Sequence, residues 1–237
     1  MPLQPRTSPG RRPSARAPAA TPARPRGRPK LRSDDEQRDA IIQAANDLFV
    51  AHGYDRTTMD DVAARCGISK RTLYRLFPSK SELFASLIRA HRSCLLALPG
   101  DYDDMPIDRA LERILRADLA PSEERQRHAI LRLVRVESAQ HPELGDILVR
   151  EGGDQMRSAL AAWLAGRAAD GSIRLEEPEV AAHILLDMVF GTMVIRGPDD
   201  PLVPKGRDRA AHVRRCIAIF LHGVARDPIS QGHPGQL

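Results

Sequence analysis

The sequence predicts an all-α protein of about nine helices, and three observations support this fold class. Aromatic residues make up only 4% of the 237 residues while apolar residues make up 42%, so the core must consist mainly of Leu, Ile, Val and Ala, which favours helices over strands. Apolar residues recur at helical spacing along most of the chain. Residues that typically begin and end helices punctuate those stretches.

The first 32 residues differ from the rest of the chain. They contain nine cations and no acids. Since the whole chain has a net charge of +5, the remainder carries −4. They also hold eight of the 19 prolines and almost no large apolar residue, so they cannot bury enough surface to offset the entropy lost on ordering. We expect residues 1–32 to be a disordered basic arm rather than a targeting segment, because they have neither an apolar signal run nor an uninterrupted amphipathic pattern.

The first helix begins at a capping box. Ser33 is followed three residues later by Glu36, the spacing at which the two side chains satisfy each other's backbone N–H groups. Apolar residues then recur at helical spacing until His52-Gly53, where the glycine predicts the end of the helix.

Two short helices follow. Thr58 is a candidate cap for one that ends at Gly67, and Ser69 for another that ends before Pro78. Helices this short are marginal in water, so packing against longer neighbours must hold them. Two short helices joined by a tight turn and braced by longer ones are typical of a helix-turn-helix, although an ordinary small bundle has the same spacing.

The fourth helix is longer and amphipathic. Ser79 and Glu82 have the pattern of a second capping box, and the apolar pattern runs through Leu95 to Pro99-Gly100. We therefore predict a unit over residues 33–98, with the helix-turn-helix at 58–77.

This unit resembles the DNA-binding domain of the TetR family of transcriptional regulators. The likeness covers residues 36–95, and the stretch TTMDDVAARCGISKRTLYRLFPSKSELF carries it in order and spacing. The matching positions are Thr58, Val62-Ala63, Gly67, Leu73-Tyr74, Phe77 and Ser79-Lys80. The chain departs from the family pattern at Arg71 and Leu76, which leaves the operator sequence open.

The resemblance and the helix geometry divide the expected DNA contacts into two groups. Thr58 and Lys80 begin helices, where free N–H groups favour a phosphate, and the resemblance adds the Tyr74 hydroxyl as a third phosphate contact. The first residues of the recognition helix face base edges, and we expect Arg71 to read a guanine. The predicted contacts of this domain are Thr58, Ser69, Lys70, Arg71, Thr72, Tyr74, Arg75 and Lys80. Leu73 and Phe77 are expected in the core, and Cys66 as a small packing residue.

The basic arm ends in PRGRPK, residues 25–30, which resembles an AT-hook. In that reading Arg26, Arg28 and Lys30 insert into or flank the minor groove of A·T-rich DNA. The alternative is nonspecific attraction to phosphates, the ordinary behaviour of a basic arm. The sequence leaves both open.

Residues 101–227 are expected to form a second, helical domain, with a disordered tail over 228–237. Its periodicity predicts one helix ending before Pro121, one before His141-Pro142, a long one to Asp170-Gly171 with a kink at Gly152-Gly153, one to Gly197-Pro198 and one to Asp227-Pro228. The last two are apolar over a wide arc, which indicates burial on more than one side. The family resemblance implies that these two pair with their copies in a homodimer, which would read a palindromic operator.

The segment LRLVRVESAQHPEL, residues 131–144, resembles the C-terminal regulatory domain of the AefR-like branch of the same family. That resemblance implies a site for a small-molecule effector. Candidate contacts are polar or soft side chains on apolar helices: His128, Trp163, His183, Asp187, Met188 and Met193. Each is also a plausible core or interface residue, and the identity of the effector does not follow.

Other classes of function fit less well. The chain has no nucleophile elbow, phosphate loop or metal-binding motif, so we expect neither an enzyme nor a cofactor. His212 and Cys216, four residues apart, supply two metal ligands without a third. Three widely spaced cysteines and no span of 18 apolar residues suit a cytosolic protein. The sequence thus predicts a homodimeric TetR-like repressor bound to DNA in the cytoplasm, or alternatively an architectural DNA-binding protein without an effector.

Overall fold

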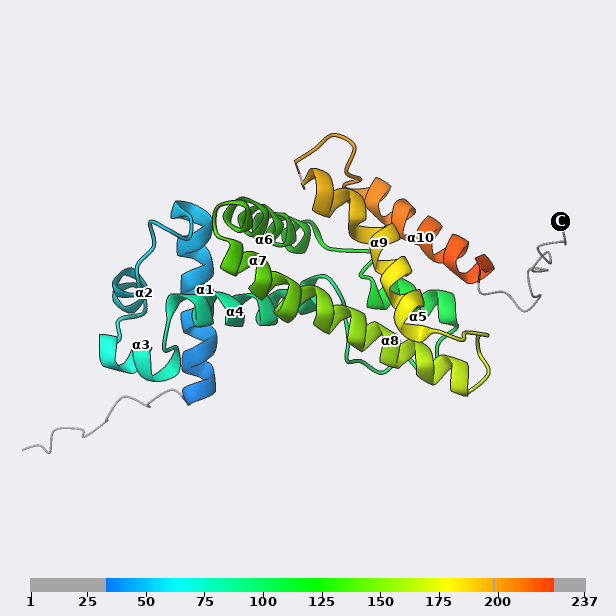
Figure 1. Cartoon of the computed structure of the whole chain (residues 1–237), viewed down its shortest axis with the longest axis horizontal. Coiled ribbons are helices and arrows are strands. Elements are labelled where there is room, and N and C mark those ends of the chain that lie inside the picture. The colour runs from blue at the N-terminus through cyan, green and yellow to red at the C-terminus, as the bar shows by residue number, and fades with distance from the viewer. Residues whose placement is uncertain (1–32, 198, 224–237) are drawn as a thin grey trace, which may run out of the picture.

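The computed structural model describes residues 33–197 and 199–223, and these residues form helices and loops without a strand (Figure 1). The predicted all-α class is therefore confirmed. The α-helices are α1 (Asp34–His52), α2 (Met59–Cys66), α3 (Lys70–Leu76), α4 (Lys80–His91), α5 (Ile107–Ile114), α6 (Pro121–Gln140), α7 (Pro142–Leu148), α8 (Asp154–Ala169), α9 (Pro178–Arg196) and α10 (Gly206–Gly223). None of these helices combines the length and the apolar character needed to cross a membrane. The predicted basic arm and the predicted tail lie outside the described residues.

Helices α1 to α4 lie at one end of the elongated molecule and α10 lies at the other (Figure 1). The first four pack around a core in which Phe49, Tyr54 and Phe84 stack in tilted and edge-to-face contacts, with ring centroids 5.4 to 6.2 Å apart. Leu73 and Phe77 are buried there, at 0% and 1% exposure, as predicted. The short helices α2 and α3 are thus held by tertiary packing, as their length requires.

The helix caps agree with the sequence in two places and differ in a third. Ser33 and Glu36 form the predicted capping box, and Thr58 forms an additional one with Asp61. At the fourth helix only half of the predicted box is present. The Ser79 hydroxyl accepts the Glu82 N–H at 3.1 Å, but the Glu82 carboxylate accepts a hydrogen bond from Arg89 instead of reaching back. Arg89, seven residues further along α4, has therefore replaced the backbone N–H as the partner of the Glu82 carboxylate.

Helix α4 ends earlier than the apolar pattern predicted. It stops at His91 and tightens into the 3-10 segment η1 (Arg92–Cys94). Leu96 then enters a second hydrophobic cluster, and the Ala97 N–H donates to the Ile114 carbonyl at 2.7 Å. The chain leaves the helix axis because its next apolar residues pack against α5, which the spacing within one segment does not reveal.

The predicted kink in the long helix is a π segment. Residues Val149–Gly153 form η2 between α7 and α8, at the Gly152-Gly153 pair. A single π turn inside a helix is a common origin of a bend. The Cβ position of Gly152 lies 3.4 Å from Ile88 of α4, so a methyl group there would make ordinary van der Waals contact with that helix.

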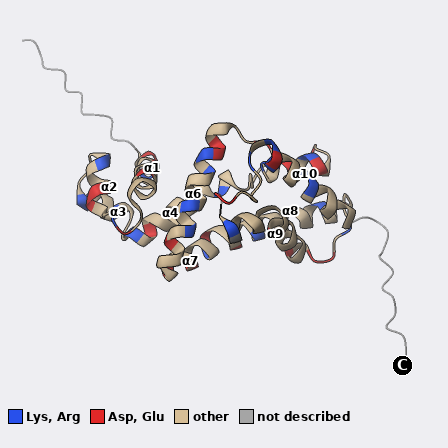
Figure 2. Cartoon of the chain, turned by 90° about the horizontal axis from the view of Figure 1, so that it is seen from above, with Lys and Arg blue, Asp and Glu red and all other residues tan. Residues whose placement is uncertain are grey.

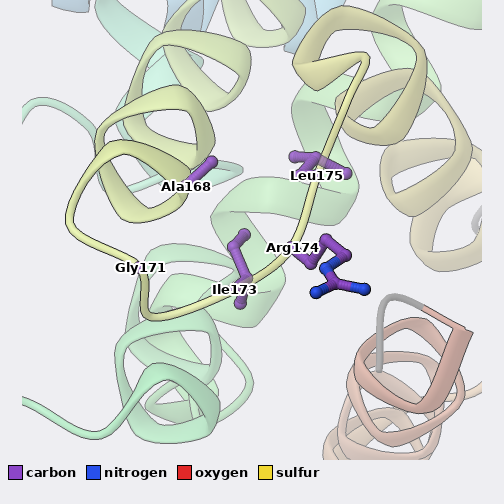
Figure 3. Close-up of a pocket in the computed structure, with 5 residues that line it drawn as sticks. All are labelled: Ala168, Gly171, Ile173, Arg174 and Leu175. Atoms are coloured by element: carbon purple, nitrogen blue, oxygen red, sulfur yellow. The ribbon is translucent and has the colours of Figure 1, made fainter. Parts of the chain in front are cut away.

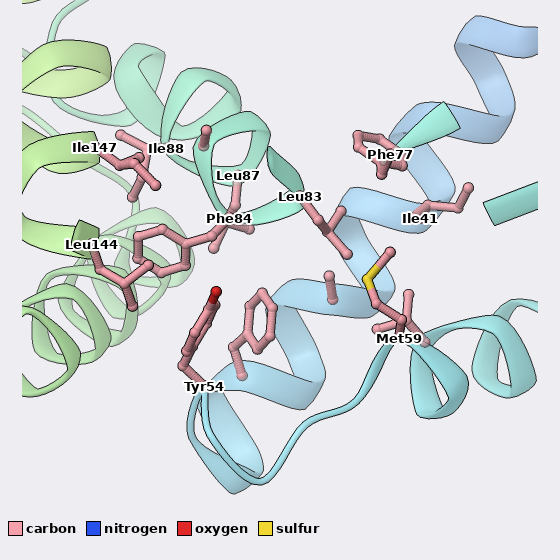
Figure 4. Packing of buried hydrophobic residues seen from close by; sticks show 14 of the residues in the cluster. Ile41, Tyr54, Met59, Phe77, Leu83, Phe84, Leu87, Ile88, Leu144 and Ile147 are labelled. Atoms are coloured by element: carbon pink, nitrogen blue, oxygen red, sulfur yellow. The ribbon is translucent and has the colours of Figure 1, made fainter. Parts of the chain in front are cut away.

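The hydrophobic residues form two clusters that do not follow the expected boundary near residue 100. The first contains the core of α1 to α4 together with residues of α6 and α7, and Figure 4 shows Leu144 and Ile147 facing Phe84 and Ile88. The second lies among the residues that follow η1 and helices α5, α8, α9 and α10. Helices α6 and α7 therefore join the two ends of the molecule through packed side chains.

Candidate nucleic-acid interface

The turn between α2 and α3 depends on one glycine. Gly67 has φ +63° and ψ +34°, the left-handed region that favours glycine. Its N–H donates to the last carbonyls of α2, and the Ile68 N–H donates to the Ala63 carbonyl at 3.1 Å. This ending of α2 sets the direction in which α3 begins three residues later.

Helix α3 has a buried face and an exposed face. Leu73 and Leu76 are buried at 0% and 3% exposure, so both belong to the core. Leu76 therefore does not face DNA, and its departure from the family pattern does not bear on operator choice. The exposed face carries Lys70, Arg71, Tyr74 and Arg75, of which Tyr74 is 47% exposed.

Two of the three cations on α3 are held by acids. The Lys70 ammonium lies 2.6 Å from the Asp60 carboxylate, and the Arg75 guanidinium binds both oxygens of Asp34 at 2.8 and 2.9 Å. These bonds raise the pKa of Lys70 above its ordinary value and hold the pKa of Asp34 below its own. Arg71 has no hydrogen bond or ion pair with any residue that the structure describes. Figure 2 shows positive and negative residues close together on α2.

Both acids were missed in the sequence. Asp60 lies ten residues before Lys70, and Asp34 lies 41 residues before Arg75, so no local spacing rule connects them. Exposed pairs of this kind contribute little to stability, because solvent screens them. A phosphate is able to replace the acids at little cost.

The helix N-termini predicted to meet phosphates differ from one another. Thr58 is exposed at the start of α2, where its hydroxyl donates to Asp61 at 2.7 Å. Ser69 and Thr72 share a hydroxyl contact of 2.8 Å across the first turn of α3. Lys80 instead points toward the loop before α2, where its ammonium donates to the Tyr54 and Thr57 carbonyls at 2.9 and 3.2 Å.

Lys80 is also close to an aromatic ring. Its ammonium lies 4.1 Å from the centroid of the Tyr54 ring, a cation–π distance. The structure therefore assigns this lysine contacts within the protein in addition to the phosphate role predicted from the sequence. Arg26, Arg28 and Lys30, the predicted minor-groove cations, lie outside the described residues.

The end of α1 and the end of α6 meet at a buried carboxylate that the sequence did not single out. Glu137 is 5% exposed and accepts the Tyr54 N–H at 2.9 Å. A Cβ on Gly53 would lie 3.0 Å from the same carboxylate oxygen, so the glycine leaves room for it. His141, at the end of α6, lies 3.0 Å from Asp55. This junction links the end of the molecule that contains α1 to α4 with helix α6.

The six predicted effector contacts do not come together in one place. His183 and Asp187 pair with each other at 3.3 Å on the exposed face of α9. Trp163 is half-buried on α8, with the Arg167 guanidinium 5.9 Å from its ring centroid. Met193 is buried at 7% exposure, ten residues further along α9 than His183.

The remaining two, His128 and Met188, are half-buried. His128 is half-buried on α6, and this burial lowers its pKa. The Met188 carbonyl oxygen lies 3.1 Å from His212 Nε2 and accepts a hydrogen bond from the Cys216 thiol at 3.4 Å. His212 and Cys216 thus share a backbone partner, and the described residues contain no cluster of three metal-binding side chains.

Two open hollows lie beside α8. The smaller, about 330 Å³, is lined by Ala168, Gly171, Ile173, Arg174 and Leu175 at the turn after this helix (Figure 3). The larger, about 850 Å³, lies between α8 and the start of α9. Of the six predicted effector contacts, only His183 lines either of them.

Comparison with known proteins places the two ends of the chain in one family of regulators. Residues 41–87 match the model of bacterial regulatory proteins of the tetR family, and residues 109–223 match that of the C-terminal domain of AefR-like transcriptional repressors. The uncharacterized HTH-type transcriptional regulator Rv1556 of Mycobacterium tuberculosis is 37% identical over 152 residues, which cover 63% of this chain and 70% of that protein. The HTH-type transcriptional activator FasR of Mycolicibacterium smegmatis is 42% identical over 57 residues, 24% of this chain and 26% of that protein.

Solved structures show the same fold. A putative TetR-family transcriptional regulator from Mesorhizobium loti matches with a TM-score of 0.60 at 21% identity, over 81% of this chain and 98% of that one. The flavonoid-responsive regulator FrrA matches with a TM-score of 0.55 at 28% identity, over 80% of this chain and 97% of that one.

Proposed function

Because the chain belongs to the TetR family of DNA-binding transcriptional regulators, we propose that it binds a palindromic operator as a homodimer and is released from DNA by a small-molecule effector. The observation that carries the proposal is the geometry of α3. Its apolar face is buried in the core, and its opposite face exposes Arg71 free of any acid that the structure describes. A guanidinium in that position suits a bidentate contact with a guanine edge.

The charge pairs that α3 forms with α2 and with α1 support an order of events on DNA. Lys70 and Arg75 are held by Asp60 and Asp34 in the unbound protein and exchange these acids for phosphates on binding. Thr58, Ser69, Thr72 and Tyr74 position the helix, and Arg71 supplies the sequence choice.

A homodimer through α9 and α10 would cover apolar surface that the single chain leaves exposed. Val180 and Ile184 on α9 and Ile219 on α10 are 50%, 52% and 54% exposed. His183 and Asp187 lie on the same face of α9, so we assign them to this interface rather than to the effector site. The two recognition helices would then read the two halves of a palindrome.

We further propose that the protein is a repressor. The match to the AefR-like repressor domain supports this direction, whereas the likeness to the activator FasR covers only a quarter of the chain. An effector is supported by that domain match and by the likeness to FrrA, which is named as flavonoid-responsive. In this proposal residues 33–98 read DNA in the cytoplasm and residues 101–227 bind the effector and the partner.

The test is selection of bound sequences from a randomised duplex library. The full chain, a variant that begins at Ser33 and an Arg71→Ala variant are compared at fixed salt of about 150 mM, because affinity for DNA falls steeply with salt. We expect a palindrome from the first two, and loss of preference at one symmetric base pair with Arg71→Ala, equivalent to about 1–3 kcal/mol. Arg125→Ala, an exposed arginine on α6, is the matched control.

The outcomes separate the two candidate functions. A palindrome supports the regulator, and A·T enrichment beside it that requires the full chain supports minor-groove insertion by the arm. Binding without any motif supports an architectural protein and contradicts the proposal. For the dimer, Ile184→Glu with Ile219→Glu should yield a monomer in sedimentation, while Val149→Glu, at an apolar residue 54% exposed on η2, should not.

A further inference from the structure

The interior of the regulatory end contains an arginine whose hydrogen-bonding groups are largely unused. Arg127 on α6 is only 3% exposed. Its Nη2 donates to the Met193 sulfur at 3.3 Å, and its guanidinium carbon lies 5.4 Å from the centroid of the Phe190 ring. Its Nε and Nη1 are buried without a hydrogen-bond partner among the described residues.

No carboxylate of the described residues forms an ion pair with this charge, although Glu124 acts on it from a distance and opposes the lowering of its pKa. Arg127 has no ion pair with any described residue, and the acid nearest to it in the chain, Glu124, accepts the Gly206 N–H at 2.7 Å. Two other arginines increase the positive charge around it. Arg116 is paired with Glu123, whereas the buried Arg209 donates only to backbone carbonyls of Leu115, Arg116 and Ala117.

Burial and the neighbouring Arg209 lower the pKa of Arg127 to about 9. The group therefore keeps its proton at neutral pH, in surroundings that penalise the charge. A buried charge without a partner is costly, and an apolar side chain of similar size would serve packing better. Packing alone gives no reason for an arginine at this position.

The geometry matches an oxyanion. The guanidinium presents parallel N–H groups that bind both oxygens of a carboxylate. Its present partner, the thioether of Met193, is a weak acceptor on a flexible side chain, so a stronger acceptor would displace it. Phe190 and Met193 offer an apolar surface beside the charge.

We propose that Arg127 anchors a small carboxylate with an apolar body, and that this is the chemical class of the effector. The inference rests on the proposed effector function and names its ligand class. The carboxylate would displace the Met193 sulfur from Nη2 and bind Nη2 together with one of the two unpartnered nitrogens, Nε or Nη1. The apolar body would pack against Phe190 and Met193 of α9.

The position of Arg127 also connects this site to the DNA-reading end. The half-buried Cys94 thiol on η1 lies close enough for the charge of Arg127 to affect its pKa, which burial raises. Segment η1 continues directly from α4, which packs in the first core. A ligand at Arg127 that favours one arrangement of η1 over another would therefore shift the DNA-reading end.

The experiment compares matched anionic and neutral probes on the full chain. Benzoate and octanoate are added at constant ionic strength, with benzamide and octanamide as neutral counterparts, and thermal unfolding is followed. At about tenfold excess over its Kd a bound carboxylate should raise the Tm by about 3 to 6 °C, and the amides should not. Arg127→Met should abolish this rise, whereas Arg132→Gln, at an exposed arginine on the same helix, should retain it.

The Arg127→Met variant also tests the reasoning without ligand. Removing an unpaired buried charge should leave the Tm unchanged or higher. Equal responses to acids and amides, no response to any probe, or a carboxylate response that survives Arg127→Met would overturn the proposal. If the variant does not fold, the comparison of acids with amides in the wild-type chain still decides.

DNA binding separates this inference from the proposed function. Arg127→Met should bind the selected operator as the wild-type chain does, but benzoate or octanoate should no longer weaken that binding. A carboxylate response without any operator motif would refute the regulator and leave the anion site standing. An operator motif without a carboxylate response would support the regulator and refute the anion site.

Discussion

The buried carboxylate of Glu137 should hold the DNA-reading end to the regulatory helices. It accepts the Tyr54 N–H at 2.9 Å across 83 residues of sequence, in a buried site. Glu137→Ala leaves that N–H without its acceptor. A hydrogen bond to a charged group contributes about 1.5–3 kcal/mol, and the lost methylene packing adds to this while relief of charge burial subtracts from it. We expect a net loss of about 2–3 kcal/mol, since breaking a buried polar contact is among the larger single-residue effects.

The assay is thermal and urea unfolding of the full chain at one protein concentration. A loss of that size corresponds to a fall in Tm of about 4 to 12 °C for a chain of this length. Glu137→Gln retains an oxygen for the Tyr54 N–H and should lose about 1 kcal/mol or less. Glu143→Ala, at a carboxylate 61% exposed on α7, is the control and should stay within about 0.5 kcal/mol. A Glu137→Ala protein as stable as that control would refute the reasoning.

Three further outcomes concern the DNA-reading end. Asp34→Asn should free Arg75, strengthen nonspecific DNA binding and steepen the dependence of log K on log salt by about 1; an unchanged slope would mean that the pair plays no part. Lys80→Met should lower stability by about 1–3 kcal/mol through loss of two carbonyl contacts, and an accompanying fall in the salt slope would show that Lys80 also meets phosphate. Burial, with smaller contributions from nearby carboxylates, raises the pKa of Tyr54 to about 12 from 10.0. The folded state therefore holds this proton more tightly, and the resulting stability is complete below about pH 10 and is lost as the pH rises toward 12. Ultraviolet titration should show one late tyrosine that disappears in Tyr54→Phe; three tyrosines titrating together would contradict it.

The sequence by itself determined most of the helices and their order. Caps, apolar spacing and stop residues act within about one turn of the chain, so they are readable without the fold. Ser33 with Glu36 and the left-handed Gly67 are examples where the local prediction and the structure agree. The kink at Gly152-Gly153 was predictable for the same reason, although its form as a π segment was not.

The tertiary structure decided how the charged groups are used. Which cation of α3 stays free depends on Asp60 and Asp34, and the fate of Glu82 depends on Arg89 rather than on its own backbone. The predicted effector contacts also separated, because the neighbouring helices cover some residues of α9 and not others: His183 lies on the surface and Met193 in the core.

Arg127 and Glu137 make the same point from the interior. Helical spacing places both on the face of α6 that carries Ile130 and Val134, whereas Arg132 is exposed, but the spacing does not show what each charge meets inside the protein. Their burial is set by α9 and by the turn after α1, which are 66 and 83 residues away in the sequence. Local spacing fixes secondary structure, whereas the desolvation and pairing of a charge depend on whichever distant element packs over it.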